Sequence, residues 1–365
     1  MSKRIIISGG GTGGHIYPAI SIANALKLID PTVEILFVGA QGRMEMEKVP
    51  AAGYKIVGLP IAGIQRSLTL KNFSVPFKLM KSLSEAGRVI KEFKPDVVVG
   101  VGGYASGPVL FMANRRGIPT LIQEQNSYAG VTNKILSKRA KCICTAYDGM
   151  ERFFPAQSII KTGNPVRQDL VNLDEKRADA YTFFGLDPNK KTVLVLGGSL
   201  GARTINRTIA AHLGEIKEQD FQVLWQTGKF YISDSKKAVE ESGATNVKEM
   251  DFIYKMDLAF AAADVVVSRA GAGTISELCL VAKPCILVPS PNVSEDHQTK
   301  NAMALVNVDA AQLVTDADCN EKLINEVVAL VNNPEKCALL TKNIAKLGIA
   351  NSAERIANEV LKLIK

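Results

Sequence analysis

The feature that most constrains the fold is a short apolar run that ends in a glycine-rich turn and continues into a helix-like stretch. Residues 4–26 read RIIISGGGTGGHIYPAISIANAL, and residues 192–213 read TVLVLGGSLGARTINRTIAAHL. Apolar runs of this kind are typical of strands buried on both faces of a parallel sheet. Because the unit occurs once in each half of the 365 residues, we predict two Rossmann-like, doubly wound α/β domains with a cleft between them.

Other β-branched runs alternate with helix-like stretches along the chain, as expected when helices join parallel strands. In the first half we predict strands at 5–7, 34–38, 96–101, 120–123 and 142–145. In the second half we predict them at 192–196, 222–226, 246–249, 264–268 and 285–288. The domains should join near 163–165, and Pro18 should lie in the first turn of a helix, where its missing N–H costs nothing.

The net charge of +8 and the pI near 9.0 favour an anionic partner. Residues 65–94 hold seven basic side chains and two acidic ones, but they lack the interleaved aromatic and arginine residues that grip single-stranded nucleic acid. We therefore expect no nucleic-acid partner. The six cysteines form no CxxC pair, so we expect reduced thiols and no metal site. No secretory signal and no apolar run of about 18 residues, as a membrane span requires, is recognised.

Four glycine-rich turns follow predicted strands, at 9–14, 100–108, 197–202 and 268–274. Glycine lets backbone amides approach an anion, and the start of the next helix adds partial positive charge. The first turn matches GxGxxG, but no acid ends the second strand and no Lys-Ser/Thr pair closes the turn, which argues against a dinucleotide site and a P-loop. Since ligands of open α/β sheets bind at these strand ends, four turns favour a bisphosphate-type ligand over tight turns without a ligand.

His15 follows the first glycine turn directly. A neutral imidazole beside an anion site can accept a proton from an incoming hydroxyl, which makes His15 a candidate general base. The alternative is a structural histidine.

Six motifs occur in the order GGGTGGHIYPA, GGYASGP, EQNSYAGVTNK, GNPVR, GGSLGA and SRAGAGTISE. Together they resemble the MurG family, the undecaprenyldiphospho-muramoylpentapeptide β-N-acetylglucosaminyltransferases, over essentially the whole chain. The resemblance implies a GT-B fold with an acceptor- and membrane-facing domain at 1–164 and a UDP-sugar donor domain at 165–349. It also implies a last helix, about 350–365, that packs back on the first domain.

The reaction that the resemblance implies is an inverting transfer of N-acetylglucosamine. The donor would be UDP-N-acetylglucosamine, and the acceptor would be the 4-hydroxyl of an undecaprenyl-diphosphate-linked N-acetylmuramoyl-pentapeptide. Such a site must hold the leaving diphosphate, supply a base for the hydroxyl and exclude water.

The resemblance also assigns residues. Donor contacts would come from Thr12, Gly13, Gly14, Asn126, Arg167, Ser199, Ile253, Ala272, Gly273, Thr274, Glu277 and Gln298. Among these, Arg167 and Ser199 would meet the diphosphate, the backbone of Ile253 the uracil, and Glu277 the ribose. Asn126 and Gln298 would contact the transferred sugar. The acceptor diphosphate would lie at Gly11, Gly102, Gly103, Tyr104 and Ser106. His15 is the candidate base, with Glu124 as the alternate.

Structural roles remain alternatives for several of these residues. They are an interdomain salt bridge for Arg167, a helix-dipole charge for Glu277, a turn cap for Asn126 and a solvated surface position for Gln298.

Two positions depart from the family pattern. Leu200 stands where many members have glutamine, which removes a side-chain contact to the donor, and His297 replaces the first residue of a common Gln-Gln pair. There is no Asp-x-Asp motif at a strand end, since Asp251 and Asp264 are isolated. We therefore expect no required cofactor and no tightly bound metal, the leaving group being neutralised by amides, a helix dipole and arginine.

Residues 76–93 are predicted to form a helix whose core face carries Leu79, Leu83, Ala86, Ile90 and Phe93. Its remaining surface would form a membrane patch of Phe77, Lys78, Met80, Lys81 and Arg88. Cations attract anionic headgroups and apolar side chains insert between them, so we expect a peripheral enzyme on the cytoplasmic face of the inner membrane. A solvated helix with two stray apolar groups is the alternative.

Three rival functions are weighed against this one. A UDP-N-acetylglucosamine 2-epimerase of related architecture would need no basic amphipathic surface. A non-catalytic sugar-nucleotide-binding subunit would keep the glycine turns but need no base. A nicotinamide oxidoreductase is disfavoured by the missing acid at the end of the second strand.

Overall fold

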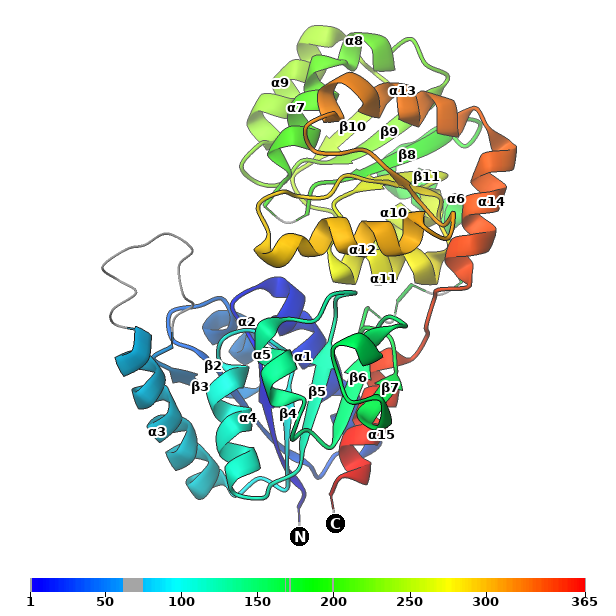
Figure 1. Cartoon of the computed structure of the whole chain (residues 1–365). Helices are drawn as coiled ribbons and strands as arrows, with labels where there is room; N and C mark the ends of the chain where they lie inside the picture. Colours follow the sequence, from blue (N-terminus) through cyan, green and yellow to red (C-terminus); the bar gives the residue numbers. More distant parts are fainter. Residues whose placement is uncertain (1, 62–74, 168, 171, 199, 365) are drawn as a thin grey trace. The chain divides into compact units, whose positions relative to one another are not determined.

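The computed structural model describes residues 2–61, 75–167, 169, 170, 172–198 and 200–364. The chain divides into two units, one of Met1–Val166 with Ala350–Lys365 and one of Arg167–Ile349. Each unit is built on one parallel sheet with helices on its two faces (Figure 1). The predicted pair of doubly wound parallel-sheet domains is therefore confirmed.

The described strands of the first sheet lie in the order β3-β2-β1-β4-β5-β6-β7, and every neighbouring pair is parallel. These strands are β1 (Arg4–Ser8), β2 (Glu34–Ala40), β3 (Lys55–Leu59), β4 (Val97–Gly100), β5 (Thr120–Glu124), β6 (Cys142–Thr145) and β7 (Ile159–Lys161). The helices of this unit are α1 (Gly13–Ile29), α2 (Glu45–Ala51), α3 (Val75–Phe93), α4 (Ser106–Arg115), α5 (Val131–Leu136) and α15 (Ser352–Lys362).

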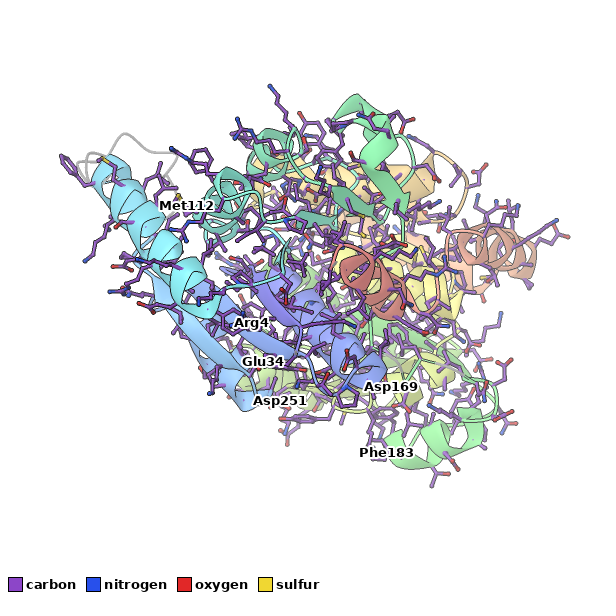
Figure 2. The ribbon with its side chains drawn as sticks, turned by 90° about the horizontal axis from the view of Figure 1, so that it is seen from below. Arg4, Glu34, Met112, Asp169, Phe183 and Asp251 are labelled. Atoms are coloured by element: carbon purple, nitrogen blue, oxygen red, sulfur yellow. The ribbon has the colours of Figure 1, made fainter. Side chains whose placement is uncertain are left out.

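Strand β1 shows why the strands of the first sheet have continuously apolar sequences. Ile5 and Ile7 pack with α1 and α15 on one face, whereas Ile6 packs with α3 and α4 on the other. Helix α15 lies against α1, so the end of the chain packs beside its beginning (Figure 1). Arg4 and Glu34 pair in register at the starts of β1 and β2, at the edge opposite the glycine turns (Figure 2).

The described strands of the second sheet lie in the order β10-β9-β8-β11-β12-β13, again all parallel. They are β8 (Lys191–Leu196), β9 (Phe221–Gln226), β10 (Val247–Met250), β11 (Val265–Ser268), β12 (Cys285–Leu287) and β13 (Gln312–Leu313). Counted within its own unit, each sheet has the Rossmann order 3-2-1-4-5-6, which the first sheet extends by β7.

The helices of the second unit are α6 (Arg177–Phe184), α7 (Arg203–Ala211), α8 (Leu213–Ile216), α9 (Ile232–Ser242), α10 (Met256–Ala262), α11 (Ala272–Val281), α12 (His297–Val306), α13 (Cys319–Val331) and α14 (Pro334–Ala345). Figure 1 shows α7, α9 and α13 on one face of this sheet and α10, α11 and α12 on the other. The glycine turns that precede α7 and α11 therefore open at the same edge, where β8 and β11 end.

The position predicted for Pro18 is wrong. Helix α1 begins at Gly13, so Pro18 lies inside the helix and not in its first turn. Its ring removes the hydrogen bond that the carbonyl of Gly14 would otherwise accept. The glycines at 13 and 14 are thus part of the helix start and not only of the turn.

Candidate functional site

The first glycine turn joins β1 to α1 and carries His15 in the first turn of the helix. Thr12 is the residue before the helix, and its Oγ1 lies 3.1 Å from Nδ1 of His15. Gly11 has a φ of 86°, in the left-handed region that favours glycine. The turn therefore holds a hydroxyl and an imidazole together at the carboxyl end of β1.

The turn between β4 and α4 lies directly against the first one. A Cβ on Gly102 would come within 2.7 Å of Cδ2 and 2.9 Å of Nε2 of His15, and a Cβ on Gly103 would come within 2.2 Å of the Gly10 carbonyl oxygen. Two of the predicted turns are thus brought together, with the His15 ring lying over Gly102.

The residues assigned to the acceptor diphosphate differ in exposure. Tyr104 is half exposed, whereas Ser106 is fully buried and its hydroxyl donates to the Gly103 carbonyl at 2.8 Å. The amide of Gly11 donates to the carboxylate of Glu45, a residue that the sequence analysis did not single out. Ser106 and the Gly11 amide therefore make hydrogen bonds within the protein that stabilise the two turns.

Glu124 ends β5 and is buried. Its carboxylate accepts hydrogen bonds from the backbone and side-chain nitrogens of Asn126, from the Gly130 amide and from Nδ2 of Asn133. With four donors on its two oxygens, Glu124 is well arranged to orient Asn126 and poorly arranged to take a proton from a substrate.

In the second unit the predicted turns surround a polar cavity of about 720 Å³. Gly197 and Gly201 line it from the turn before α7, and Gln298 lines it from the start of α12. Arg203 and Arg207 of α7 also line it, and both are exposed. The sequence analysis missed these arginines, although they follow the GGSLGA turn directly. Ser199 of that turn lies outside the described residues.

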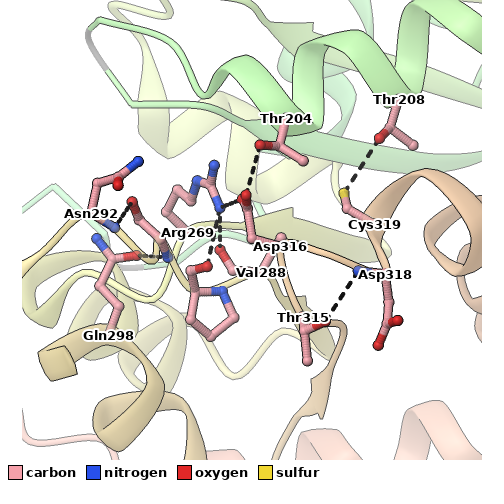
Figure 3. A network of polar contacts seen from close by, with 12 residues as sticks. Thr204, Thr208, Arg269, Val288, Asn292, Gln298, Thr315, Asp316, Asp318 and Cys319 are labelled. Atoms are coloured by element: carbon pink, nitrogen blue, oxygen red, sulfur yellow. Dashed lines mark hydrogen bonds and ion pairs between the residues drawn. The ribbon is translucent and has the colours of Figure 1, made fainter.

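A network around Arg269 connects the loops that form this cavity (Figure 3). Nη1 of Arg269 donates to the Val288 and Pro289 carbonyls at 3.1 and 3.2 Å. The same nitrogen forms an ion pair with Oδ1 of Asp316. Oδ2 of Asp316 accepts a hydrogen bond from Thr204 of α7 at 2.9 Å. Nearby, Oε1 of Gln298 accepts from the Ser290 amide at 2.8 Å (Figure 3). The loops after β11, β12 and β13 are therefore tied to each other and to α7.

The two charged residues predicted for the donor contact each other. Nε of Arg167 lies 2.9 Å from Oε1 of Glu277 on α11. Burial raises the pKa of the Glu277 carboxyl, and the guanidinium of Arg167 acts in the opposite direction. Ala272, Gly273 and Thr274 form the first turn of the same helix.

Ile253, the residue expected to meet the uracil, is buried after β10. The backbone N–H of Ile253 donates to Oε1 of Gln226 at 3.1 Å, so this group is already bonded within the protein.

Helix α3 carries the predicted membrane patch. Phe77 is 77% exposed and Met80 is 69% exposed, beside exposed Lys78 and Lys81, and Nε of Arg88 lies 4.0 Å from a Glu92 oxygen. The placement of Leu79 in the core is wrong, since it is 43% exposed and extends the apolar part of the patch. Across the described residues, no helix is both long enough and apolar enough to cross a membrane.

Both halves of the chain match models of one family. Residues 5–145 match the glycosyltransferase family 28 N-terminal domain, and residues 192–360 match its C-terminal domain. A relative from Parabacteroides distasonis is 58% identical over 361 residues, which cover 99% of this chain and 98% of the relative. A relative from Phocaeicola vulgatus is 61% identical over 361 residues, which cover 99% of this chain and 96% of the relative. Both are named UDP-N-acetylglucosamine--N-acetylmuramyl-(pentapeptide) pyrophosphoryl-undecaprenol N-acetylglucosamine transferase.

Solved structures agree with these matches. The crystal structure of Acinetobacter baumannii MurG has a TM-score of 0.81 at 27% identity and covers 99% of both chains. A UDP-GlcNAc 2-epimerase from Neisseria meningitidis has a TM-score of 0.66 at 17% identity, covering 99% of this chain and 100% of that one, a likeness of fold alone. The chain therefore belongs to glycosyltransferase family 28 and, within it, to the MurG family of N-acetylglucosamine transferases.

Proposed function

We propose that the protein transfers N-acetylglucosamine from UDP-N-acetylglucosamine to the 4-hydroxyl of undecaprenyl-diphosphate-linked N-acetylmuramoyl-pentapeptide. The observation that carries this proposal is the identity of 58–61% over nearly the full length of relatives named for this transfer. Family models match both units, so we propose that this one chain binds both the donor and the acceptor.

We assign the donor to the second unit. The diphosphate would lie in the 720 Å³ cavity, near the start of α7 and its two arginines. Glu277 would bind the ribose hydroxyls once the diphosphate attracts Arg167 away from it. Because the Gln298 carbonyl is held by Ser290, its amide nitrogen would meet the sugar. The carbonyl of Ile253 would meet the uracil, with Ala272, Gly273 and Thr274 lining the sugar side.

His15 is proposed as the general base, with Thr12 orienting the imidazole through Nδ1. The acceptor oxygen would attack the anomeric carbon while its proton passes to the imidazole, and the bond from that carbon to the UDP oxygen would break. Attack from the opposite face inverts the anomeric configuration. Glu124 is proposed to hold Asn126 in place, because its oxygens already accept four hydrogen bonds.

We propose that no tightly bound metal and no cofactor take part, because arginines, backbone amides and a helix start are available to the leaving diphosphate. Transfer should then continue in excess chelator. A loss of activity that added magnesium restores would contradict this.

We further propose that the protein binds the cytoplasmic face of the inner membrane through α3. The exposed Phe77, Leu79 and Met80 lie among Lys78 and Lys81, a combination that suits anionic headgroups. Helix α4, which carries Met112 (Figure 2), packs on α3 and adds exposed Phe111 and Arg115. Binding should require anionic lipid vesicles and weaken with salt. Equal binding to neutral vesicles, or none, would contradict it.

The transfer itself is tested with labelled UDP-N-acetylglucosamine and a short-chain analogue of the lipid acceptor. We expect label in the lipid product, and much less from UDP-N-acetylgalactosamine. No labelled lipid from either donor would overturn the proposal.

A further inference from the structure

Glu45 is a buried acid that no step of the proposed reaction uses. It is the first residue of α2, it is 1% exposed, and it lies beside the first glycine turn. Its Oε1 accepts from the Ala40 amide at the end of β2, and its Oε2 accepts from the Gly11 amide, each at 2.9 Å. The side chain therefore joins the end of β2 to the turn that leaves β1.

Two glycines are shaped around this side chain. A Cβ on Gly10 would come within 2.1 Å of Oε1 of Glu45, and a Cβ on Gly39 would come within 2.6 Å of its Cγ. No larger residue fits at either position unless Glu45 moves. These glycines are thus explained by the packing of the acid and need no ligand.

The same turn is held from its other side by the β4–α4 turn. The Gly10 carbonyl oxygen lies where a Cβ on Gly103 would be, and the His15 ring lies where a Cβ on Gly102 would be. The segment from Gly10 to His15 is thus packed between Glu45 and the second turn.

We propose that Glu45 is a positioning residue for the transfer reaction: its carboxylate fixes the β1–α1 turn and so sets where Thr12 and His15 stand. This inference rests on the proposed function. It also implies that the Gly11 amide serves the turn and is not a ligand of the acceptor diphosphate.

The chemistry calls for a carboxylate at this position. Each of its two oxygens accepts one backbone N–H, and the start of α2 favours a negative charge. A glutamine of the same size would turn an NH₂ group toward one of those two N–H donors, so one amide would lose its partner.

The test compares Glu45→Gln and Glu45→Asp with the control Glu47→Gln, which changes an exposed acid on the same helix. We expect kcat to fall tenfold or more in Glu45→Gln. The Kd for UDP should stay within twofold, because the proposed UDP contacts lie in the other unit. Glu45→Asp, which keeps both acceptor oxygens, should recover part of the lost kcat. Glu47→Gln should behave as the wild type.

An active wild type whose Glu45→Gln variant keeps kcat within twofold would overturn this inference alone. So would a variant in which kcat, UDP affinity and melting temperature all fall together, because that pattern reports a structural role. A wild type without transfer activity would overturn the proposed function, and this inference with it.

Discussion

At the residue scale, the contact between Arg167 and Glu277 makes the stability of the fold depend on the protonation state of Glu277. The pKa of Glu277 lies above its ordinary value of 4.5 because the carboxyl is buried, and Arg167 opposes that shift. A carboxyl with a raised folded-state pKa favours folding when protonated and disfavours it as the pH rises through that pKa. The Arg167 guanidinium therefore stabilises the folded state most when Glu277 is ionised.

We predict that Arg167→Met lowers the free energy of unfolding by about 1 kcal/mol near pH 7, a small loss because solvent screens the partly exposed guanidinium. The deficit should shrink as the pH falls through the raised pKa of Glu277, because the protonated carboxyl no longer attracts the guanidinium. Urea unfolding across this range measures it. Lys237→Met, which removes an exposed ion pair with Glu241 in the same unit, is the control and should show no such trend. A deficit independent of pH would contradict the prediction.

His15 gives a second prediction at this scale. His15→Ala should lower kcat roughly a hundredfold or more, as expected for loss of a general base, while the Kd for UDP measured by calorimetry stays nearly unchanged. His212, at the end of α7, bonds the Thr208 carbonyl within its own helix, and His212→Ala should leave kcat as it is. Full turnover in His15→Ala would remove His15 from the mechanism.

At the element scale, the interior strands of both sheets and the edge strand β10 were predicted, whereas three other edge strands were not. VVVG and TVLVL are buried on both faces, so their sequences are apolar throughout. The missed strands β3, β7 and β13 are edge strands of five, three and two residues, too short or too exposed to show that pattern. Leu79 was misplaced because helical periodicity continues past the point where α3 loses contact with the core.

The candidate site was predictable only in part for a related reason. The sequence motifs predicted where the glycine turns lie, but the residues that hydrogen-bond to or pair with these turns lie far away in the sequence. Glu45 follows β2, and Asp316 follows β13, and neither belongs to one of the four glycine-rich motifs. Only tertiary packing brings them to Gly11 and Arg269.

The Arg269 network gives a prediction at the element scale. Asp316→Asn should lower the free energy of unfolding by roughly 3 kcal/mol, because it leaves a mostly buried guanidinium without its anionic partner. It should also weaken UDP binding, since the loops around the cavity are no longer tied together. Asp318→Asn, on the same segment but paired with exposed Lys322, should cost much less stability, because solvent screens this pair. Equal losses in the two variants would contradict the role of the network.

At the scale of the whole molecule, the chain uses one strand order twice and adds a helix at its end. The internal repeat predicted the two sheets. The return of α15 to the first unit was implied only by the family resemblance, because an amphipathic helix does not specify which surface it covers. Ile356, Ala357 and Val360 of α15 are fully buried against that unit.

This packing predicts a large effect from a residue far from both glycine turns. Ile356→Ala should lower the free energy of unfolding by about 3 kcal/mol, as expected for a cavity in a core. Leu339→Ala, an exposed position on α14, should change it by less than about 0.5 kcal/mol. A mild effect of Ile356→Ala would show that α15 is not part of the folded core.

The central claim is that the full chain makes a new glycosidic bond on a lipid-linked acceptor. The most direct measurement incubates it with UDP-N-acetylglucosamine, with and without the short-chain acceptor, and identifies every product by NMR and mass spectrometry. We predict equal amounts of UDP and a β-linked disaccharide lipid with the acceptor present, and unchanged donor without it. Conversion of the donor to its 2-epimer, or no disaccharide lipid at all, would contradict the account.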